Sequence, residues 1–220
     1  MHYSIDGTVA HSVKLEPTAA ETAWASKGTI IAHTDGIEWD VRMPGGVTSA
    51  FKRALSGEGV ALAHIRSVSA GQSIILGANA VGHLMEWSLA AQGPVYTTRG
   101  AFLAAWGDGI EISVAVAKRA GAAFFGGAGL VLQRVEGDGT VLIHGSGDFR
   151  QIELAPGEEL RVSTGHLAAF SDSVDYSIES VGSVRKTLFG KEGFFMARLR
   201  GPGTVLLRSL KPAKQANIPT

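Results

Sequence analysis

Seven histidines are the side chains of this sequence best suited to metal binding or acid–base catalysis. They are His2, His11, His33, His64, His83, His144 and His166. No two of them form an H-x-H or H-E-x-x-H spacing, which would bring two imidazoles to one metal ion. We therefore interpret them as ordinary strand and loop residues and predict no metal site. A site assembled from histidines distant in the sequence stays open as an alternative.

Serine, cysteine and phosphate chemistry have no matching motif either. A serine nucleophile at a strand-to-helix elbow needs G-x-S-x-G, and the nearest string, HGSGD at 144–148, has another spacing. The phosphate-binding pattern G-x-x-x-x-G-K-[ST] is absent, and the glycines of 126–129 lead into an expected strand. The chain has no cysteine, which excludes thiolate chemistry and disulfides. We predict a protein that is not an enzyme, with no catalytic residues and no cofactor.

Acidic residues recur at matching places in three segments of the chain. They are Asp35, Asp108 and Asp172, followed three residues later by Glu38, Glu111 and Asp175. Three converging carboxylates could bind a cation on a common axis. Aspartate is also a common turn residue, and an acid on the outer face of a strand is what alternation predicts. We favour this structural interpretation.

Three pairs of basic residues also recur, and they form our candidate ligand-binding site. They are Lys52 and Arg53, Lys118 and Arg119, and Arg185 and Lys186. If the three segments surround a common axis, these pairs would form a basic rim that attracts phosphate groups of lipid or nucleic acid. The alternative is that they are solvated charges which keep an apolar protein soluble.

The composition indicates a soluble protein with much surface to bury. Twenty basic and twenty acidic residues cancel, so no net field attracts nucleic acid. Charged residues make up 18% of the chain, below the usual value of about 25%, and a subunit interface would bury the additional apolar surface. The first residues do not resemble a targeting peptide, and the longest uncharged run, 67–85, is too polar to span a membrane. We expect a cytoplasmic protein with no transmembrane segment.

The elements that must position these residues form an internal repeat. Its first element reads GTIIAHTDGIEWDV from Gly28, GAFLAAWGDGIEISV from Gly100 and GHLAAFSDSVDYSI from Gly165. After each aspartate, β-branched or aromatic residues alternate with polar ones, which is typical of a half-buried strand. Asp-Gly is a preferred hairpin turn because glycine accepts a positive φ. We predict a β-hairpin here in each repeat.

The second element starts at a Gly-x-x-Gly pattern and also predicts a hairpin. It reads SGEGVALAHIRSVSAGQSIIL from Ser56, GGAGLVLQRVEGDGTVLIH from Gly126 and GKEGFFMARLRGPGTVLLRS from Gly190. A glycine turn separates two apolar runs in each case. A leader strand precedes the first element in 89–99 and 154–164, and a longer version occupies 15–27.

These elements define one β domain over residues 1–210. Its three repeats cover about 15–76, 89–145 and 154–209, and 211–220 is expected to be a flexible tail. Repeats of this length usually copy one supersecondary unit and form the core between the copies. We predict an all-β, sandwich or barrel-like domain with few short helices. The three units either surround a pseudo-threefold axis, which we favour, or form a two-sheet sandwich.

Three segments resemble the AIM-twenty-four family, named for altered inheritance of mitochondria. They are SGEGVALAHI, AKRAGAAFFGGAGLVL and LFGKEGFFMARLRGPGTVLL, and residues 188–209 are the most specific part. The resemblance runs from about 15 to 210. It implies a β fold like that of the tryptophan RNA-binding attenuator protein and a link to mitochondrial biogenesis, and it brings no catalytic residues. One departure is Ala128, where the other repeats have Glu58 and Glu192.

We expect a non-enzymatic scaffold or binding protein that self-associates, as a trimer, beside a membrane. The grounds are the low charge density, the threefold repetition, the absent catalytic set and the family resemblance. Its partners would be anionic lipid or another protein. The alternatives are an RNA-binding protein, suggested by the fold resemblance alone, and a small-molecule-binding protein or enzyme with a pocket between hairpins. Balanced charge and few aromatic residues disfavour RNA.

Overall fold

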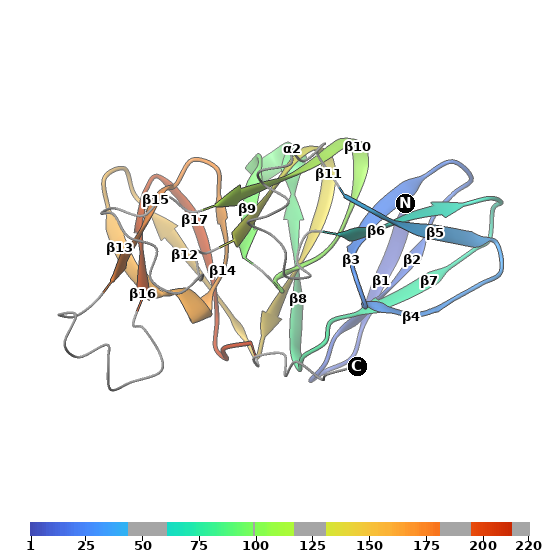
Figure 1. Ribbon diagram of the computed structural model, residues 1–220, viewed down its shortest axis with the longest axis horizontal. Coiled ribbons are helices and arrows are strands. Elements are labelled where there is room, and N and C mark those ends of the chain that lie inside the picture. Colours follow the sequence, from blue (N-terminus) through green and yellow to red (C-terminus); the bar gives the residue numbers. More distant parts are fainter. Residues whose placement is uncertain (44–60, 99, 117–130, 181–194, 213–220) are drawn as a thin grey trace.

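The computed structural model describes residues 1–43, 61–98, 100–116, 131–180 and 195–212. Nearly all regular structure in these ranges is β-strand, so the all-β prediction is confirmed (Figure 1). The strands are β1 (His2–Asp6), β2 (Ser12–Glu16), β3 (Thr22–Ser26), β4 (Ile30–His33), β5 (Ile37–Arg42), β6 (Leu62–Ser67), β7 (Ile74–Gly77), β8 (Gly82–Ser88), β9 (Val95–Thr98), β10 (Phe102–Val116), β11 (Val131–Ser146), β12 (Phe149–Leu154), β13 (Glu159–Ser163), β14 (Leu167–Ser171), β15 (Asp175–Ser180), β16 (Phe195–Arg200) and β17 (Gly203–Arg208). The helical elements of the described residues are the short α2 (Leu89–Gln92) and η1 (Thr164–His166).

The strands form a four-stranded, a ten-stranded and a three-stranded sheet. The first has the order β1-β2-β7-β4 and the last the order β13-β16-β15. The large sheet runs β12-β17-β14-β9-β11-β10-β3-β6-β5, and β8 pairs with β11 beside this path. Among the described strands no sheet closes into a barrel.

Each predicted hairpin is instead a corner at which the chain leaves one set of partners and joins another. β4 pairs with β7 whereas β5 pairs with β6, so the strands on either side of Asp35 are not partners. The same holds for β14 and β15, while β10 and β11 pass through their corners as single long strands. The hairpin prediction is therefore wrong in its pairing. The motif does mark a tight turn, in which Ile37 N donates to Thr34 O and Val174 N donates to Ser171 O, both at 3.0 Å.

The described strands fall into three successive units with the same internal pairing. Unit 1 is β2–β7, unit 2 is β8–β11 and unit 3 is β12–β17. In each unit a bent first segment (β4–β5, β10 or β14–β15) pairs with a bent second segment (β6–β7, β11 or β16–β17). The register shifts directly after the same position of each first segment, which is Ile30, Phe102 or Leu167. The three units thus share one pattern of strand pairing, and the repeat in the sequence stays a prediction.

Glycine allows the two long strands of unit 2 to bend together. Gly107 lies opposite Gly139 in the pairing of β10 with β11. A Cβ atom on Gly139 would lie 2.1 Å from Trp106 O, and one on Gly107 would lie 2.2 Å from Asp138 O. The backbones approach too closely here for any side chain.

A leader strand joins each unit to the next. β3 pairs with β6 of its own unit and with β10 of unit 2. β9 pairs with β11 of its own unit and with β14 of unit 3. β13 pairs with β16, and no strand occupies its other edge within the described residues. The part of each first segment before the corner, which we call the first arm, is β4 in unit 1, residues 102–106 of β10 in unit 2 and β14 in unit 3. Within the described residues, β4 pairs with β7 alone.

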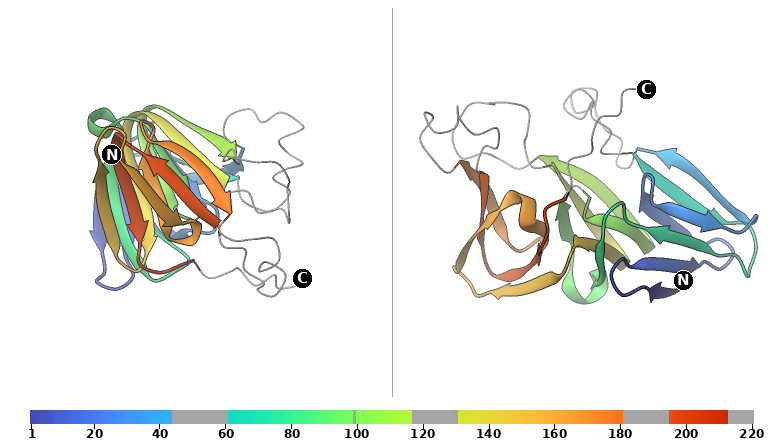
Figure 2. Two further views of the ribbon diagram at one scale, coloured as in Figure 1. Left: turned by 90° about the vertical axis from the view of Figure 1, so that its left-hand side faces the viewer. Right: turned by 90° about the horizontal axis from the view of Figure 1, so that it is seen from below.

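The three units consequently form a row. Figure 1 shows unit 3 at the left, unit 2 in the centre and unit 1 at the right, and Figure 2 shows the same order from below. Strand pairing joins unit 1 to unit 2 and unit 2 to unit 3, and no pairing between described strands joins unit 3 to unit 1. This row replaces the pseudo-threefold arrangement that we favoured from the sequence.

Neighbouring units share their core. Leu62 of unit 1 belongs to the same buried cluster as Ile112 of unit 2. Leu132 of unit 2 belongs to the same cluster as Phe170 and Ile178 of unit 3. Burying a side chain of this size contributes about 1.5–3 kcal/mol, so each unit depends on its neighbour for part of its stability.

Candidate functional site

The three basic pairs proposed as a ligand-binding rim lie outside the described residues. They are Lys52 and Arg53, Lys118 and Arg119, and Arg185 and Lys186. Their role in lipid binding therefore stays a prediction from the sequence.

The recurring acids do not converge on one point. They lie at or just after the corners of three units that follow one another along the row. Asp172 accepts hydrogen bonds from Arg134 Nε at 2.8 Å and Nη2 at 3.2 Å, and these bonds lower the pKa of the Asp172 carboxyl. Glu38 pairs with Arg66. Within the described ranges no three His, Asp or Glu side chains are grouped so that they could hold a metal ion.

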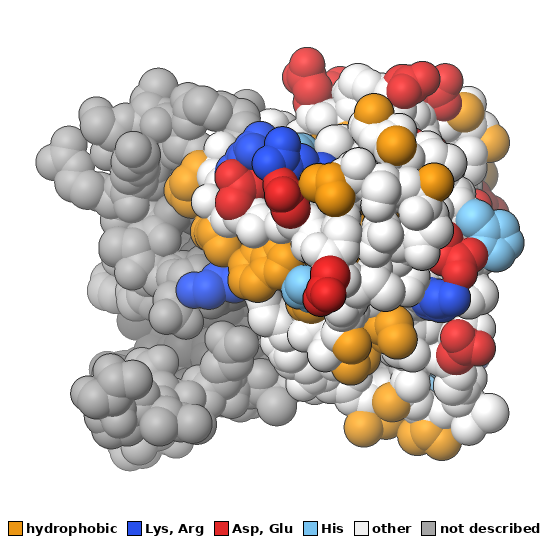
Figure 3. All heavy atoms as spheres, turned by 90° about the vertical axis from the view of Figure 1, so that its right-hand side faces the viewer, with side chains coloured by type: hydrophobic (Ala, Val, Ile, Leu, Met, Phe, Trp, Pro, Cys, Tyr) orange, Lys and Arg blue, Asp and Glu red, His pale blue; other side chains and the backbone are white. Residues whose placement is uncertain are grey.

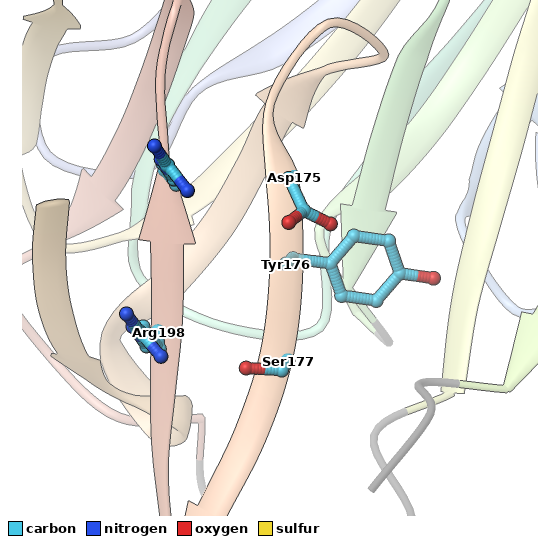
Figure 4. A pocket seen from close by; sticks show the side chains of 5 residues that line it. Asp175, Tyr176, Ser177 and Arg198 are labelled. Atoms are coloured by element: carbon cyan, nitrogen blue, oxygen red, sulfur yellow. The ribbon is translucent and has the colours of Figure 1, made fainter. Parts of the chain in front are cut away.

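A small open pocket lies on unit 3 (Figure 4). It is lined by Asp175, Tyr176 and Ser177 of β15 and by Arg198 and Arg200 of β16. Arg198 donates to Glu159 through Nε and Nη2, and its Nη1 lies 3.7 Å from Glu179. Its charge is thus compensated by two carboxylates, and Tyr176 extends away from it (Figure 4). The pocket is an ion-paired surface and brings together no acid–base or nucleophilic set.

Two histidines that are distant in the sequence meet between units 1 and 2. The rings of His11 and His83 are in edge contact with centroids 4.5 Å apart, and His83 Nδ1 lies 3.2 Å from Asp148 Oδ1. Leu84 N donates to His11 Nδ1 at 3.1 Å. Sequence reasoning missed this cluster because bridges at Gly82 bring the three segments together. The contacts fix a junction between chain segments.

The strongest candidate site is the exposed first arm of unit 1. β4 occupies the place that residues 102–106 of β10 and 167–171 of β14 occupy in the other units. All ten of those residues are buried, whereas β4 has no buried residue. Ile31 is 62% exposed, while its counterparts Leu103 and Ala168 are 1% and 0% exposed. A leader strand pairs with the first arms of units 2 and 3, whereas none of the described strands lies beside β4 on that edge.

The next strand of unit 1 continues this apolar surface. Trp39 and Val41 of β5 are exposed. The counterparts of Trp39 are the buried Ile112 and the half-buried Tyr176, and those of Val41 are the half-buried Val114 and the buried Ile178. Figure 3 looks onto the end of the row formed by unit 1 and shows hydrophobic side chains on its surface. This end therefore has both an open strand edge and exposed apolar side chains.

At the opposite end of the row, the outer edge of β13 is likewise unpaired among the described strands. Leu160 of β13 is half-buried, whereas Ala23 of β3 and Val95 of β9, its counterparts in the other leader strands, are buried. Arg161 is exposed, and its Nε lies 3.6 Å from Glu179. An edge strand with free backbone groups is a template for pairing with another strand. One end of the row thus presents a leader strand, β13, and the other presents a first arm, β4. These are the two strands that pair at each internal junction.

The fold defines an all-β protein whose row of units ends, among the described strands, in the unpaired edges of β4 and β13. Within the described ranges, no helix is long and apolar enough to cross a membrane. The family model described as Mitochondrial biogenesis AIM24 matches residues 3–210, so the chain belongs to this family. The resemblance noted in the sequence is thereby confirmed for the family, while the likeness to the tryptophan RNA-binding attenuator protein stays an expectation.

Two bacterial proteins are similar to this chain. An uncharacterised protein of Streptococcus pyogenes serotype M6 is 25% identical over 219 residues, which cover 96% of this chain and 86% of that protein. The crystal structure of protein SPYM3_0169 from Streptococcus pyogenes has a TM-score of 0.77 at 22% identity, covering 96% of this chain and 94% of that one. This second likeness shows the fold.

Histidine protonation should weaken the fold in mildly acidic solution. Burial lowers the pKa of His11, His64 and His144 below the ordinary value of 6.5. The unfolded chain then binds more protons than the folded one as the pH falls below about 6.5, so stability decreases with falling pH. We expect a lower urea midpoint at pH 5.5 than at pH 7.5. His144→Asn should reduce this difference, and an unchanged midpoint in the unsubstituted protein would contradict the lowered pKa values.

Proposed function

We propose that this protein is a non-enzymatic scaffold or binding protein that works as a self-associated assembly. The observation that carries the proposal is the loss of burial at unit 1. The segment equivalent to β4 is buried in both other units, and β4 itself lies open. A second copy of the chain would supply the cover that a neighbouring unit supplies inside the row.

The energetics favour covering these ends. Burial of an exposed isoleucine or tryptophan is worth about 1.5–3 kcal/mol, and Ile31, Trp39 and Val41 are all exposed at one end. Open sheet edges also add backbone donors and acceptors that can pair. The low proportion of charged residues, 18%, agrees with a surface that is partly covered in the working form.

The proposal extends to an anionic membrane surface in the cytoplasm. Its support is the family, whose description names mitochondrial biogenesis, together with the three recurring Lys and Arg pairs of the sequence. Clustered basic residues are attracted to anionic lipid headgroups by about 1 kcal/mol each. Reversing the charge at all three pairs should abolish sedimentation with phosphatidylserine-containing liposomes, measured beside the unchanged protein. Equal sedimentation of both proteins would remove lipid from the proposal.

Self-association is tested directly by mass. Sedimentation velocity over roughly a hundredfold range of protein concentration should show species at multiples of the 22.9 kDa chain, with the trimer as the number expected from the sequence. Ile31→Lys should shift the distribution toward the monomer, because it places a charge on the surface to be covered. Val81→Lys, at another exposed site, is the matched control. A monomer at every concentration would refute self-association.

A further inference from the structure

We infer that β13 of one chain pairs antiparallel with β4 of the next chain, in the register that the row already uses at its two internal junctions. The inference rests on the proposed self-association and specifies its interface. The partner is a second copy of this chain, because the internal junctions show how a leader strand and a first arm of this type fit together.

The two internal junctions have one register. In the first, Ala25, Trp24 and Ala23 of β3 lie opposite Ala104, Ala105 and Trp106 of β10. In the second, Thr97, Tyr96 and Val95 of β9 lie opposite Ala169, Phe170 and Ser171 of β14. Each leader strand also pairs with its own unit in one register, since Ser26, Thr98 and Ser163 lie opposite Leu62, Leu132 and Met196. These matches fix which residues of β13 correspond to those of β3 and β9.

The same register applied to the open ends defines three residue pairs. Val162 would lie opposite Ala32 of the next chain, Arg161 opposite His33, and Leu160 opposite Thr34. Both His33 and Arg161 are exposed, so neither side chain has to leave a core to form the junction. Antiparallel pairing would add backbone hydrogen bonds between the two edges.

A side-chain hydroxyl strengthens each internal junction at the same place. Ser26 Oγ donates to Phe102 O at 2.5 Å, and Thr98 Oγ1 donates to Leu167 O at 2.8 Å. Both carbonyls belong to the residue directly before the register shift of the first segment. Ser163 is the corresponding residue of β13, and its side chain makes no cap hydrogen bond at η1. In the junction between chains it would donate to the carbonyl of Ile30.

The side chains around this register are complementary. At the second internal junction the ring of Tyr96 lies 5.2 Å from that of Phe170 and 5.5 Å from that of Tyr176. The residues at the corresponding places of the open ends are Arg161, His33 and Trp39. The pairing therefore places a guanidinium against an indole, which is a favourable cation–π contact. It would also cover Trp39, which is exposed in the single chain.

This junction is head-to-tail, because the two surfaces that meet are different. An open assembly of this type leaves one β4 edge and one β13 edge unpaired at its two ends. Only a closed ring pairs all of these edges. The order of the units would continue from chain to chain, with each leader strand covering the next first arm.

Disulfide trapping tests the register, since the chain has no cysteine of its own. Arg161→Cys and His33→Cys are prepared as separate proteins, mixed and oxidised gently. Residues directly opposite in antiparallel strands have Cα atoms about 4.5–5.5 Å apart, within the range of about 4.4–6.8 Å that a disulfide spans. The mixture should give a covalent dimer, and each protein alone should stay uncrosslinked. Arg161→Cys mixed with Ala32→Cys is the matched control, because a one-residue offset places the two thiols on opposite faces.

The possible results distinguish a wrong strand register from a failure of the chain to self-associate at all. If the proteins associate under reducing conditions but Arg161→Cys and His33→Cys do not crosslink, the register is wrong and the scaffold proposal survives. A dimer formed by either protein alone, or preferential crosslinking of the Ala32→Cys control, also overturns the register. If the unsubstituted chain and both variants are monomeric at every concentration, the interface and the proposed self-association are both wrong.

Discussion

The pairing of a leader strand with the first arm of the following unit is the interaction on which the whole molecule depends. β3 on β10 and β9 on β14 extend one sheet through three units, and they allow Leu62 and Leu132 to enter the core of the next unit. A hydroxyl donated to a carbonyl beside a bulge accompanies both pairings. Without these junctions each unit would expose a strand edge and an apolar face, which is the condition of the two ends.

A row of units that each bury their neighbour necessarily ends with unsatisfied surface. Repeat proteins meet this problem with polar capping repeats, and β proteins meet it with charged or covered edges. β5 of unit 1 carries the exposed charged residues Glu38, Asp40 and Arg42, whereas β4 has no Asp, Glu, Lys or Arg and leaves Ile31 exposed. β13 carries two exposed charged residues, Glu159 and Arg161. The self-association proposed above would repeat, between two chains, the strand pairing that holds the row together.

Much of the fold could be predicted from the sequence, because alternation and turn residues report local structure. The corners at Asp35 and Asp172 and the leader strand before Gly100 lie where the patterns indicated. Pairing could not be predicted, since an aspartate turn suits a hairpin and a corner equally well and only distant strands decide between them. The contact of His11 with His83 had no local signal. The exposure of Ile31 could be recognised only by comparing buried positions across the three units.

Hydrogen–deuterium exchange of the assembled and the diluted protein tests the central claim that one junction is repeated inside the chain and between chains. We predict that backbone amides of residues 30–34 and 159–163 exchange slowly when the protein is concentrated and rapidly when it is dilute. The amides of β9 and β14 should be protected in both samples, because their junction is internal. Rapid exchange at both ends in an assembled sample, with protection elsewhere on the surface, would contradict the account.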